Sequence, residues 1–441
     1  MASTYLTRTF QSGGNTAKWT FSAWIKKCAI TNNDDTIFSR YQSADYYTTV
    51  AFGSDRLFFT QRHAGSNVGY LETEQHFRDT NGWYHFVIVW DSGNSTANNR
   101  MRIYVNGSEI TVFNTRTNPS QDLGSTWNTA HPMEIGRHNS GNYFNGFMSH
   151  IHFCDGYAYS PSDFGETDSN GVWRIKTSPS VSYGTTGFTI LKDGNSVTDQ
   201  SGNSNNWTVS GGTLTDDKDN PSNVFATLNP LANTSQTLSH GNTSGYGVVN
   251  KAYTATLGFQ GGKYYWEAKC VTQNTYTMIV GITNETNLQN GSFTSSNIGT
   301  NANGWAYFMQ SNQDNGKSFH NNSLGSVYQT VSQGGILQIA VDADAGKIWW
   351  GVNGTWVNSG NPATGANAVY TNVSTDQILF PAYSAYDGSG GNPLISFNFG
   401  NGRFGTTAVS SAGTNASGNG VFEYDVPTGY TALCTKGLNG E

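Results

Sequence analysis

The feature that most constrains the fold is a strand pattern that occurs twice, about 250 residues apart. In each copy an apolar strand leads to an acidic residue and a turn, and a second apolar strand ends in Val-Asn-Gly. The strands are residues 83–90 and 100–105 in the first copy, and residues 336–341 and 347–352 in the second. Asn-Gly favours a type I′ hairpin because both residues tolerate positive φ. The repeat predicts two sandwiches of related topology, against the alternative that two unrelated meanders coincide.

The composition supports an all-β chain. Aromatic residues make up 13% of the sequence and charged residues 12%, whereas disordered chains are poor in aromatics and rich in charge. The polar residues are mostly Asn, Ser, Thr and Gly, which form turns, while Trp, Tyr, Phe and Thr favour strands. Short alternating runs bounded by Gly, Asn and Asp recur, and no segment of a dozen residues keeps a helical apolar period. We therefore predict an all-β fold of two antiparallel β-sandwiches.

The length of 441 residues favours two or three domains. We place one sandwich at residues 1–165 and the other at residues 246–441. Residues 166–245 are dominated by Ser, Thr, Asn, Gly and Asp, with strand-like pieces at 187–191 and 206–209. A long polar stretch of pure loop is uncommon in a compact chain. This region is therefore predicted to be a polar connector that contains a small β-element.

The first sandwich contains seven short motifs: WTFSAWIK at 19–26, TIFS at 36–39, GWYH at 82–85, IYVNG at 103–107, FNGFMS at 144–149, IHF at 151–153 and YSP at 159–161. Taken together they resemble the laminin-G-like, concanavalin A-like family. The second sandwich contains KYYWE at 263–267, GI at 281–282, IAVD at 339–342, KIWWGVNG at 347–354 and FNFG at 397–400. These motifs resemble the SPRY family. Both families are curved two-sheet β-sandwiches, so both resemblances imply the fold that the repeat predicts.

Four further segments are NPSN at 220–223, ATLNPL at 226–231, DVPTGY at 425–430 and ALCT at 432–435. They resemble the joints and tails of tailed-phage virion proteins. The resemblance implies a fibre or capsid-decoration protein on the virion surface, made in the host cytoplasm and in contact with other virion proteins. Its function would be attachment to host or environmental glycans through loops on rigid sandwiches. A homo-oligomer is expected because weak sugar sites gain by avidity, and a trimer is the form expected of a fibre.

Three other functions remain open: a purely structural decoration or adaptor protein of the virion, a polysaccharide-degrading enzyme, and a cellular lectin or adhesin. Retaining glycosidases need two carboxyl groups about 5–5.5 Å apart, and the E-x-D-x-x-E pattern of glucanases with this fold is absent. Glu72 with Glu74, and Asp342 with Asp344, are paired carboxylates in a polar stretch and beside a turn. G-x-S-x-G and H-E-x-x-H are also absent. We expect a binding protein and not an enzyme.

The net charge of −7 and the lack of a basic cluster argue against nucleic acid and against anionic lipid. The longest apolar runs, such as residues 86–90, are too short to span a membrane. The start of the sequence lacks the pattern of a signal peptide, which argues against an exported lectin or adhesin. The four cysteines form no C-x-x-C pair, so zinc is not expected. They are predicted to be buried thiols, with disulfides open if the protein functions outside a cell.

No cofactor is expected, and calcium is the one ion left open. Related sandwiches hold Ca²⁺ in acidic loops through oxygen ligands, and turn-forming aspartates explain the same residues. The candidates are Asp34, Asp35, Asp216, Asp217 and Asp219. His150 and His152 have the spacing to share one face of a strand, but no third ligand is evident beside them.

Loop aromatics beside polar residues are the candidate ligand contacts, because a sugar stacks on an aromatic ring while polar side chains bind its hydroxyls. Ordinary turn and rim packing is the alternative. Five tryptophans in strong strand patterns are assigned to the core instead: Trp24, Trp83, Trp90, Trp266 and Trp349. The candidates form three groups: Arg137, His138, Asn139, Asn142 and Tyr143; Tyr41, Asp45, Tyr46 and Tyr47; and Tyr383, Tyr386 and Asp387 in a Gly-rich region of the second sandwich.

Overall fold

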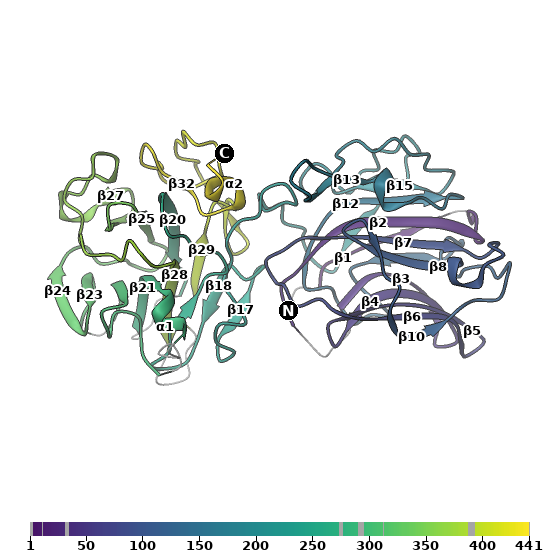
Figure 1. Cartoon of the computed structure of the whole chain (residues 1–441), viewed down its shortest axis with the longest axis horizontal. Helices are drawn as coiled ribbons and strands as arrows, with labels where there is room; N and C mark the ends of the chain where they lie inside the picture. Colours follow the sequence, from purple (N-terminus) through teal and green to yellow (C-terminus); the bar gives the residue numbers. More distant parts are fainter. Residues whose placement is uncertain are drawn as a thin grey trace. The chain divides into compact units, whose positions relative to one another are not determined.

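The computed structural model describes residues 3–10, 12–30, 35–272, 277–289, 295–311, 313–386 and 393–440. The chain forms two compact units (Figure 1). Unit 1 comprises Met1–Asp216 and Asn220–Ser222, and unit 2 comprises Asp217–Asp219 and Asn223–Glu441. Nearly all regular structure is antiparallel sheet, so the predicted all-β fold class is confirmed. Within the described ranges, no helix is both long enough and apolar enough to cross a membrane.

Unit 1 is a sandwich of an eight-stranded and a six-stranded sheet. The larger sheet contains, from one edge to the other, β10 (Phe113–Thr117), β6 (Ser66–His76), β5 (Arg56–His63), β4 (Tyr46–Gly53), β3 (Asp35–Ser43), β11 (Pro132–Ile135), β1 (Tyr5–Thr9) and β16 (Thr208–Ser210). The smaller sheet contains, from one edge to the other, β15 (Phe188–Ile190), β12 (Gly146–Asp155), β2 (Lys18–Lys27), β7 (Tyr84–Asp91), β8 (Met101–Val105) and β9 (Ser108–Glu109). A separate pair joins β13 (Gly165–Thr167) to β14 (Trp173–Ile175). The core includes Trp19, Phe38 and Trp127, all at 0% exposure.

Unit 2 repeats this two-sheet plan. Its larger sheet contains β17 (Thr237–Ser239), β18 (Ser244–Tyr246), β29 (Ile395–Asn398), β20 (Lys263–Cys270), β25 (Ile336–Asp342), β26 (Lys347–Val352) and β27 (Thr355–Trp356) in that order, with β32 (Thr431–Ala432) beside β20. The other contains β19 (Tyr253–Thr254), β28 (Leu379–Tyr386), β21 (Thr277–Asn284), β22 (Gly304–Gln310), β23 (Lys317–His320) and β24 (Ser323–Val327) in that order. The remaining elements are β30 (Arg403–Phe404), β31 (Thr407–Ala408), α1 (Glu285–Gln289) and α2 (Thr435–Leu438).

The repeated hairpin is confirmed in both units. β2, β7, β8 and β9 are neighbours in unit 1, and β20, β25, β26 and β27 are neighbours in the same order in unit 2. The first turn has φ of 47° at Asn106 and 86° at Gly107, and the second has 49° at Asn353 and 87° at Gly354. Two successive positive φ values are the signature of a type I′ turn, so the Asn-Gly prediction is correct at both sites.

The structure corrects the predicted connector at residues 166–245. β15 pairs with β12, and β16 pairs with β1, so the first part of this stretch completes the sheets of unit 1. The side chains of Phe188 and Trp207 lie in the core at 0% and 4% exposure. β17 and β18 belong to unit 2. The polar stretch is therefore divided between the units, because its few apolar residues are needed at the sheet edges.

Four of the five tryptophans assigned to the core are buried: Trp24, Trp90, Trp266 and Trp349. Trp83 is only half-buried, because it lies just before the start of β7. Cys28, Cys154, Cys270 and Cys434 are all buried, as predicted for thiols.

Candidate functional site

The hairpin of β3 and β4 positions the candidate site. Tyr41 on β3 lies directly opposite Tyr47 on β4. Phe38 and Val50, also paired, lie in the core. Because successive residues of a strand face opposite sides, Tyr41 and Tyr47 project from the outer face of the large sheet. Their rings stack with centroids 6.2 Å apart and an interplanar angle of 28°, and both side chains are half-buried.

His138 joins this pair from a distant part of the sequence. Its ring centroid lies 5.2 Å from those of both Tyr41 and Tyr47, in edge-to-face geometry. Its Nδ1 is 2.9 Å from Oγ1 of Thr49, which fixes the ring orientation. Burial lowers the pKa of His138 below its usual value, so the ring is neutral at pH 7. The aromatic platform, as we call Tyr41, Tyr47 and His138, unites two of the three groups that the sequence predicts.

A cation and two further rings lie on β1 and in the loop between β11 and β12. The Arg137 guanidinium lies over the Tyr5 ring at 3.4 Å from its centroid. The centroids of Tyr5 and Tyr143 are 6.3 Å apart. Arg137 forms a two-point ion pair with Glu134, with Nε 3.0 Å from Oε2. This pairing raises the pKa of Arg137 further above its usual value, so the guanidinium is a fixed positive group.

The other predicted residues of unit 1 lie in a loop or at the β3–β4 turn. Asn139 and Asn142 are exposed in a loop with φ of 47° and 50°. Asp45 and Tyr46 are exposed at the turn of the β3–β4 hairpin. The Tyr46 ring is 40% exposed and contacts His63, with centroids 5.9 Å apart.

The structure corrects the third predicted group. Tyr383 is not a loop residue: it lies in β28, between β19 and β21, and is 0% exposed. Its hydroxyl donates to Oε1 of Gln236 at 3.0 Å, and its ring packs on Tyr253. Tyr383 therefore does not lie in a ligand-binding loop. Tyr386 is the last residue of β28, and Asp387 lies outside the described residues.

Two family models match the chain: the concanavalin A-like lectin/glucanases superfamily over residues 2–163, and the SPRY domain over residues 263–402. The protein contains a concanavalin A-like domain and a SPRY domain. Unit 1 holds the first and unit 2 the second.

Three solved structures are similar to parts of this chain. The SPRY domain of human HERC1 is 19% identical and matches 38% of this chain and 96% of its own, with a TM-score of 0.30. The TRIM65 PSpry domain is 17% identical and matches 39% and 89%, with a TM-score of 0.30. The heptameric SAP-like pentraxin from Limulus polyphemus is 20% identical and matches 36% and 71%, with a TM-score of 0.27. A comparison with curated protein sequences found no match.

The paired carboxylates considered for catalysis make structural contacts. In the concanavalin A-like domain, Glu72 accepts from the side-chain amide of Asn114, and Glu74 lies 3.6 Å from Arg56. In the SPRY domain, Asp342 lies 3.1 Å from Nζ of Lys263, and Asp344 accepts from the backbone N–H of Gly262.

The histidine pair does not share a regular face. β12 has an irregular register between Ser149 and His152, and His150 has a φ of 47°. The bulge interrupts the strand alternation on which the prediction rested. His152 is buried with Nδ1 2.9 Å from the Tyr183 hydroxyl, while Nδ1 of His150 is 2.8 Å from Oγ of Ser149.

The calcium candidates are dispersed. Asp34 lies outside the described residues, and Asp35 is buried at the start of β3. The Asp217 carboxylate accepts from the backbone N–H of Asp219 and the side-chain amide of Asn401. Over the described ranges, no three His, Cys, Asp or Glu residues gather closely enough to hold a metal ion.

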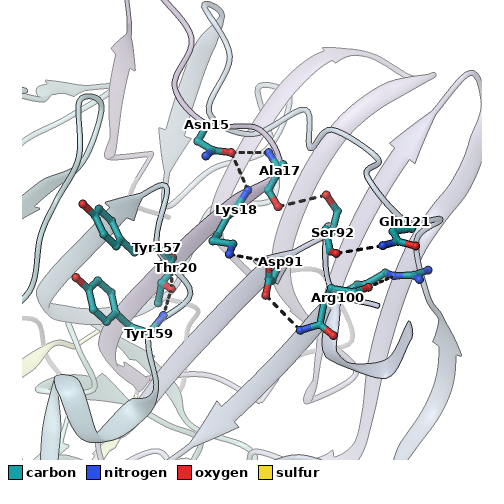
Figure 2. Close-up of polar contacts among 12 residues, drawn as sticks. Asn15, Ala17, Lys18, Thr20, Asp91, Ser92, Arg100, Gln121, Tyr157 and Tyr159 are labelled. Atoms are coloured by element: carbon teal, nitrogen blue, oxygen red, sulfur yellow. Dashed lines mark hydrogen bonds and ion pairs between the residues drawn. The ribbon is translucent and has the colours of Figure 1, made fainter. Parts of the chain in front are cut away.

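A second aromatic pair, which the sequence did not predict, lies at another loop of the concanavalin A-like domain. Tyr157 and Tyr159 stack with centroids 5.4 Å apart and an interplanar angle of 17°, and Figure 2 shows the two rings side by side. Oγ1 of Thr20 donates to the Tyr157 carbonyl and accepts from the Tyr159 N–H. Tyr157 is 41% exposed. Two tyrosines separated by one residue beside a glycine were the only sequence signal.

A polar depression of about 490 Å³ adjoins Tyr157. It is lined by Gly13, Gly14, Asn15, Asp155, Gly156, Tyr157, Gly184 and Thr185. The Asp155 carboxylate accepts from the backbone N–H groups of Asn15 and Thr185. Oδ1 of Asn15 accepts from the backbone N–H of Lys18, whose Nζ pairs with Asp91 at 3.4 Å (Figure 2). These contacts tie the loops together but leave few polar groups for a ligand. The aromatic platform is therefore the stronger candidate for a ligand-binding site.

Proposed function

We propose that the protein binds glycans on the aromatic platform of its concanavalin A-like domain. The observation that carries the proposal is the convergence of Tyr41, Tyr47 and His138 on one face of the large sheet. Aromatic rings offer an apolar face to a sugar ring, and tyrosine adds a hydroxyl for hydrogen bonding.

The polar rim suits a ligand rich in hydroxyl groups. Arg137 beside the platform is a fixed donor, and Asn139 and Asn142 are exposed in the adjoining loop. A second cation, Arg62, lies with its guanidinium 6.0 Å from the Tyr47 centroid. Binding sites commonly combine apolar and aromatic surface with a few placed polar groups, and this combination favours a sugar over a purely apolar ligand.

The biological role we propose is attachment of a virion to host or environmental glycans, as a fibre or capsid-decoration protein. The resemblance of residues 220–231 and 425–435 to phage virion proteins supports this role. A shallow platform gives weak binding per site, and a homo-oligomer, a trimer in the case of a fibre, would raise the overall affinity through avidity. Other virion proteins would then be the second class of partner.

The test is binding of the full chain to a panel of microbial polysaccharides and whole cells, with and without a calcium chelator. Tyr41→Ala is the variant. Tyr157→Ala is the matched control, since it removes another stacked tyrosine of the same domain. We expect saturable binding to an envelope glycan that Tyr41→Ala loses and Tyr157→Ala keeps. No saturable binding by the folded protein would favour the structural-decoration role, and loss of binding in Tyr157→Ala alone would move the site to the second pair.

A further inference from the structure

Arg40 is a buried cation that has no acidic partner among the described residues. Its side chain lies on β3 next to Tyr41 but faces the opposite side of the sheet, toward the sandwich interior, and is 2% exposed. Nη2 donates to Oε1 of Gln42 at 2.9 Å. Within the described ranges, Nε and Nη1 have no hydrogen-bond partner and no carboxylate forms an ion pair with Arg40. Burial of a guanidinium in this state is costly.

Other unpartnered nitrogens occupy the same face of the sheet. Arg40 pairs with Thr48 across β3 and β4, and Thr48 pairs with Gln61 across β4 and β5. Oε1 of Gln61 accepts from the hydroxyls of Thr48 and Ser125, at 2.7 and 3.0 Å. The amide orientation is therefore fixed, and Nε2 of Gln61 is left as a buried donor without a partner in the described part of the chain.

His63 contributes a fourth unpartnered nitrogen, after the two of Arg40 and the one of Gln61. It lies two residues beyond Gln61 on β5, so the strand alternation places both side chains on one face. Its Nε2 is buried, and no described residue is its hydrogen-bond partner. After burial itself, the positive charge of Arg40 is the next cause that lowers the pKa of His63, and the same holds for His131. Both imidazoles therefore lie within electrostatic range of Arg40.

All of the unpartnered nitrogens can donate hydrogen bonds. Arg40 contributes two donors and Gln61 one, while Nε2 of His63 becomes a donor in the appropriate tautomer. A guanidinium matches the geometry of carboxylate, sulfate and phosphate. Although the whole chain has a net charge of −7, Arg40 places a positive charge at this position.

We propose that Arg40, Gln61 and His63 form a binding site for an oxyanion, such as the carboxylate or sulfate group of an acidic glycan or a free inorganic anion. The site is separate from the aromatic platform, because Arg40 and Tyr41 face opposite sides of β3. Anion binding at this site can therefore be tested independently of neutral-glycan binding at the platform.

The experiment is calorimetric titration of the full chain with sodium sulfate, sodium phosphate and an oligoglucuronate, at constant ionic strength set with chloride. A neutral glucose oligomer of equal length is the fourth ligand. Arg40→Met removes the charge while keeping a long side chain. Arg174→Met is the matched control, since Arg174 is paired with Asp168 on β14, outside this sheet. We expect saturable binding of at least one oxyanion, weakened at least tenfold in Arg40→Met and unchanged in Arg174→Met.

Gln61→Glu keeps the test decisive if Arg40→Met does not fold. This variant places a carboxylate where the guanidinium lacks one. We expect it to raise the melting temperature and to abolish oxyanion binding. Preference for oligoglucuronate over sulfate and phosphate would identify a glycan group as the source, and the reverse preference would identify a free inorganic anion. Absence of saturable oxyanion binding, or equal binding by wild type and Gln61→Glu, would overturn the proposal.

Discussion

Asn106 and His85 are joined by two hydrogen bonds: the backbone N–H of Asn106 donates to the His85 carbonyl, and the backbone N–H of His85 donates to Oδ1 of Asn106. The SPRY domain contains the same arrangement, between Asn353 and Ile336. The turn asparagine thus closes the hairpin and also pins the start of the preceding strand. This double use explains why Asn, and not merely a residue that tolerates positive φ, occupies the position.

Replacement of either asparagine is expected to destabilise its own domain. Asn353→Ala loses the Oδ1 acceptor and places alanine at a φ of 49°, which together cost about 2 kcal/mol. Asn353→Gly keeps the backbone relaxed and loses only the acceptor, so it costs about 1 kcal/mol. Urea unfolding of the two variants measures the difference. Equal stability of wild type and Asn353→Ala would contradict this explanation.

Glu267 gives the SPRY domain a pH-dependent stability. The carboxylate is 0% exposed and accepts from the backbone N–H groups of Glu423 and Tyr424 and from the Tyr265 hydroxyl. Burial nevertheless raises its pKa from 4.5 to about 7. Since the folded pKa lies above the unfolded one, the stabilising contribution is complete below pH 4.5 and is lost as the pH rises through 7.

We therefore expect the SPRY unfolding free energy to fall by on the order of 3 kcal/mol between pH 4.5 and 8 through this group. Glu267→Gln, which stays neutral, is expected to flatten that part of the profile, while Glu166→Gln at an exposed position leaves it unchanged. Denaturant unfolding at a series of pH values provides the measurement. A Glu267→Gln profile as steep as that of wild type would refute the assignment.

Trp207 tests the revised boundary of the concanavalin A-like domain. Its ring packs on Phe188 with centroids 4.9 Å apart and is 4% exposed. Trp207→Ala is expected to destabilise that domain by about 3–5 kcal/mol through loss of buried area and the cavity left behind. Calorimetry should show a lower melting temperature for one transition and an unchanged second one. An unchanged first transition would restore an independent connector.

Tyr383 tests the corrected site. Tyr383→Phe removes the hydroxyl that donates to Gln236 and keeps the ring, so it is expected to cost about 1 kcal/mol in SPRY stability. Glycan binding should be unchanged, because the side chain is fully buried. A selective loss of binding without loss of stability would return Tyr383 to the list of ligand contacts.

Local signals in the sequence predicted local structure well. The two Asn-Gly hairpins follow from backbone chemistry at four residues, and Tyr41 and Tyr47 meet because they flank one short turn. Contact with His138 depends on β11 pairing with β3, which no nearby residue encodes. Short edge strands such as β15 and β16 have three residues each, too few for a periodic pattern, so the connector prediction failed there.

The face of the sheet toward which a side chain points was the other feature that the sequence did not predict. Tyr383 precedes a Gly-rich segment, which suggested a loop, but the pairing of β28 with β21 turns it into the core. Arg40 is the opposite case: a charged residue is expected at the surface, and only the pairing of β3, β4 and β5 shows that it faces the interior. In both cases the register of a sheet decided the environment.

The most direct test of glycan recognition compares Tyr47→Ala with Tyr47→Phe in calorimetric titrations against the polysaccharide that binds the wild type best. If the flat ring face supplies the contact, Tyr47→Ala weakens binding at least tenfold, equivalent to about 1.4 kcal/mol, while Tyr47→Phe binds almost as wild type does. Equal affinity of Tyr47→Ala and wild type would contradict the platform as the binding site.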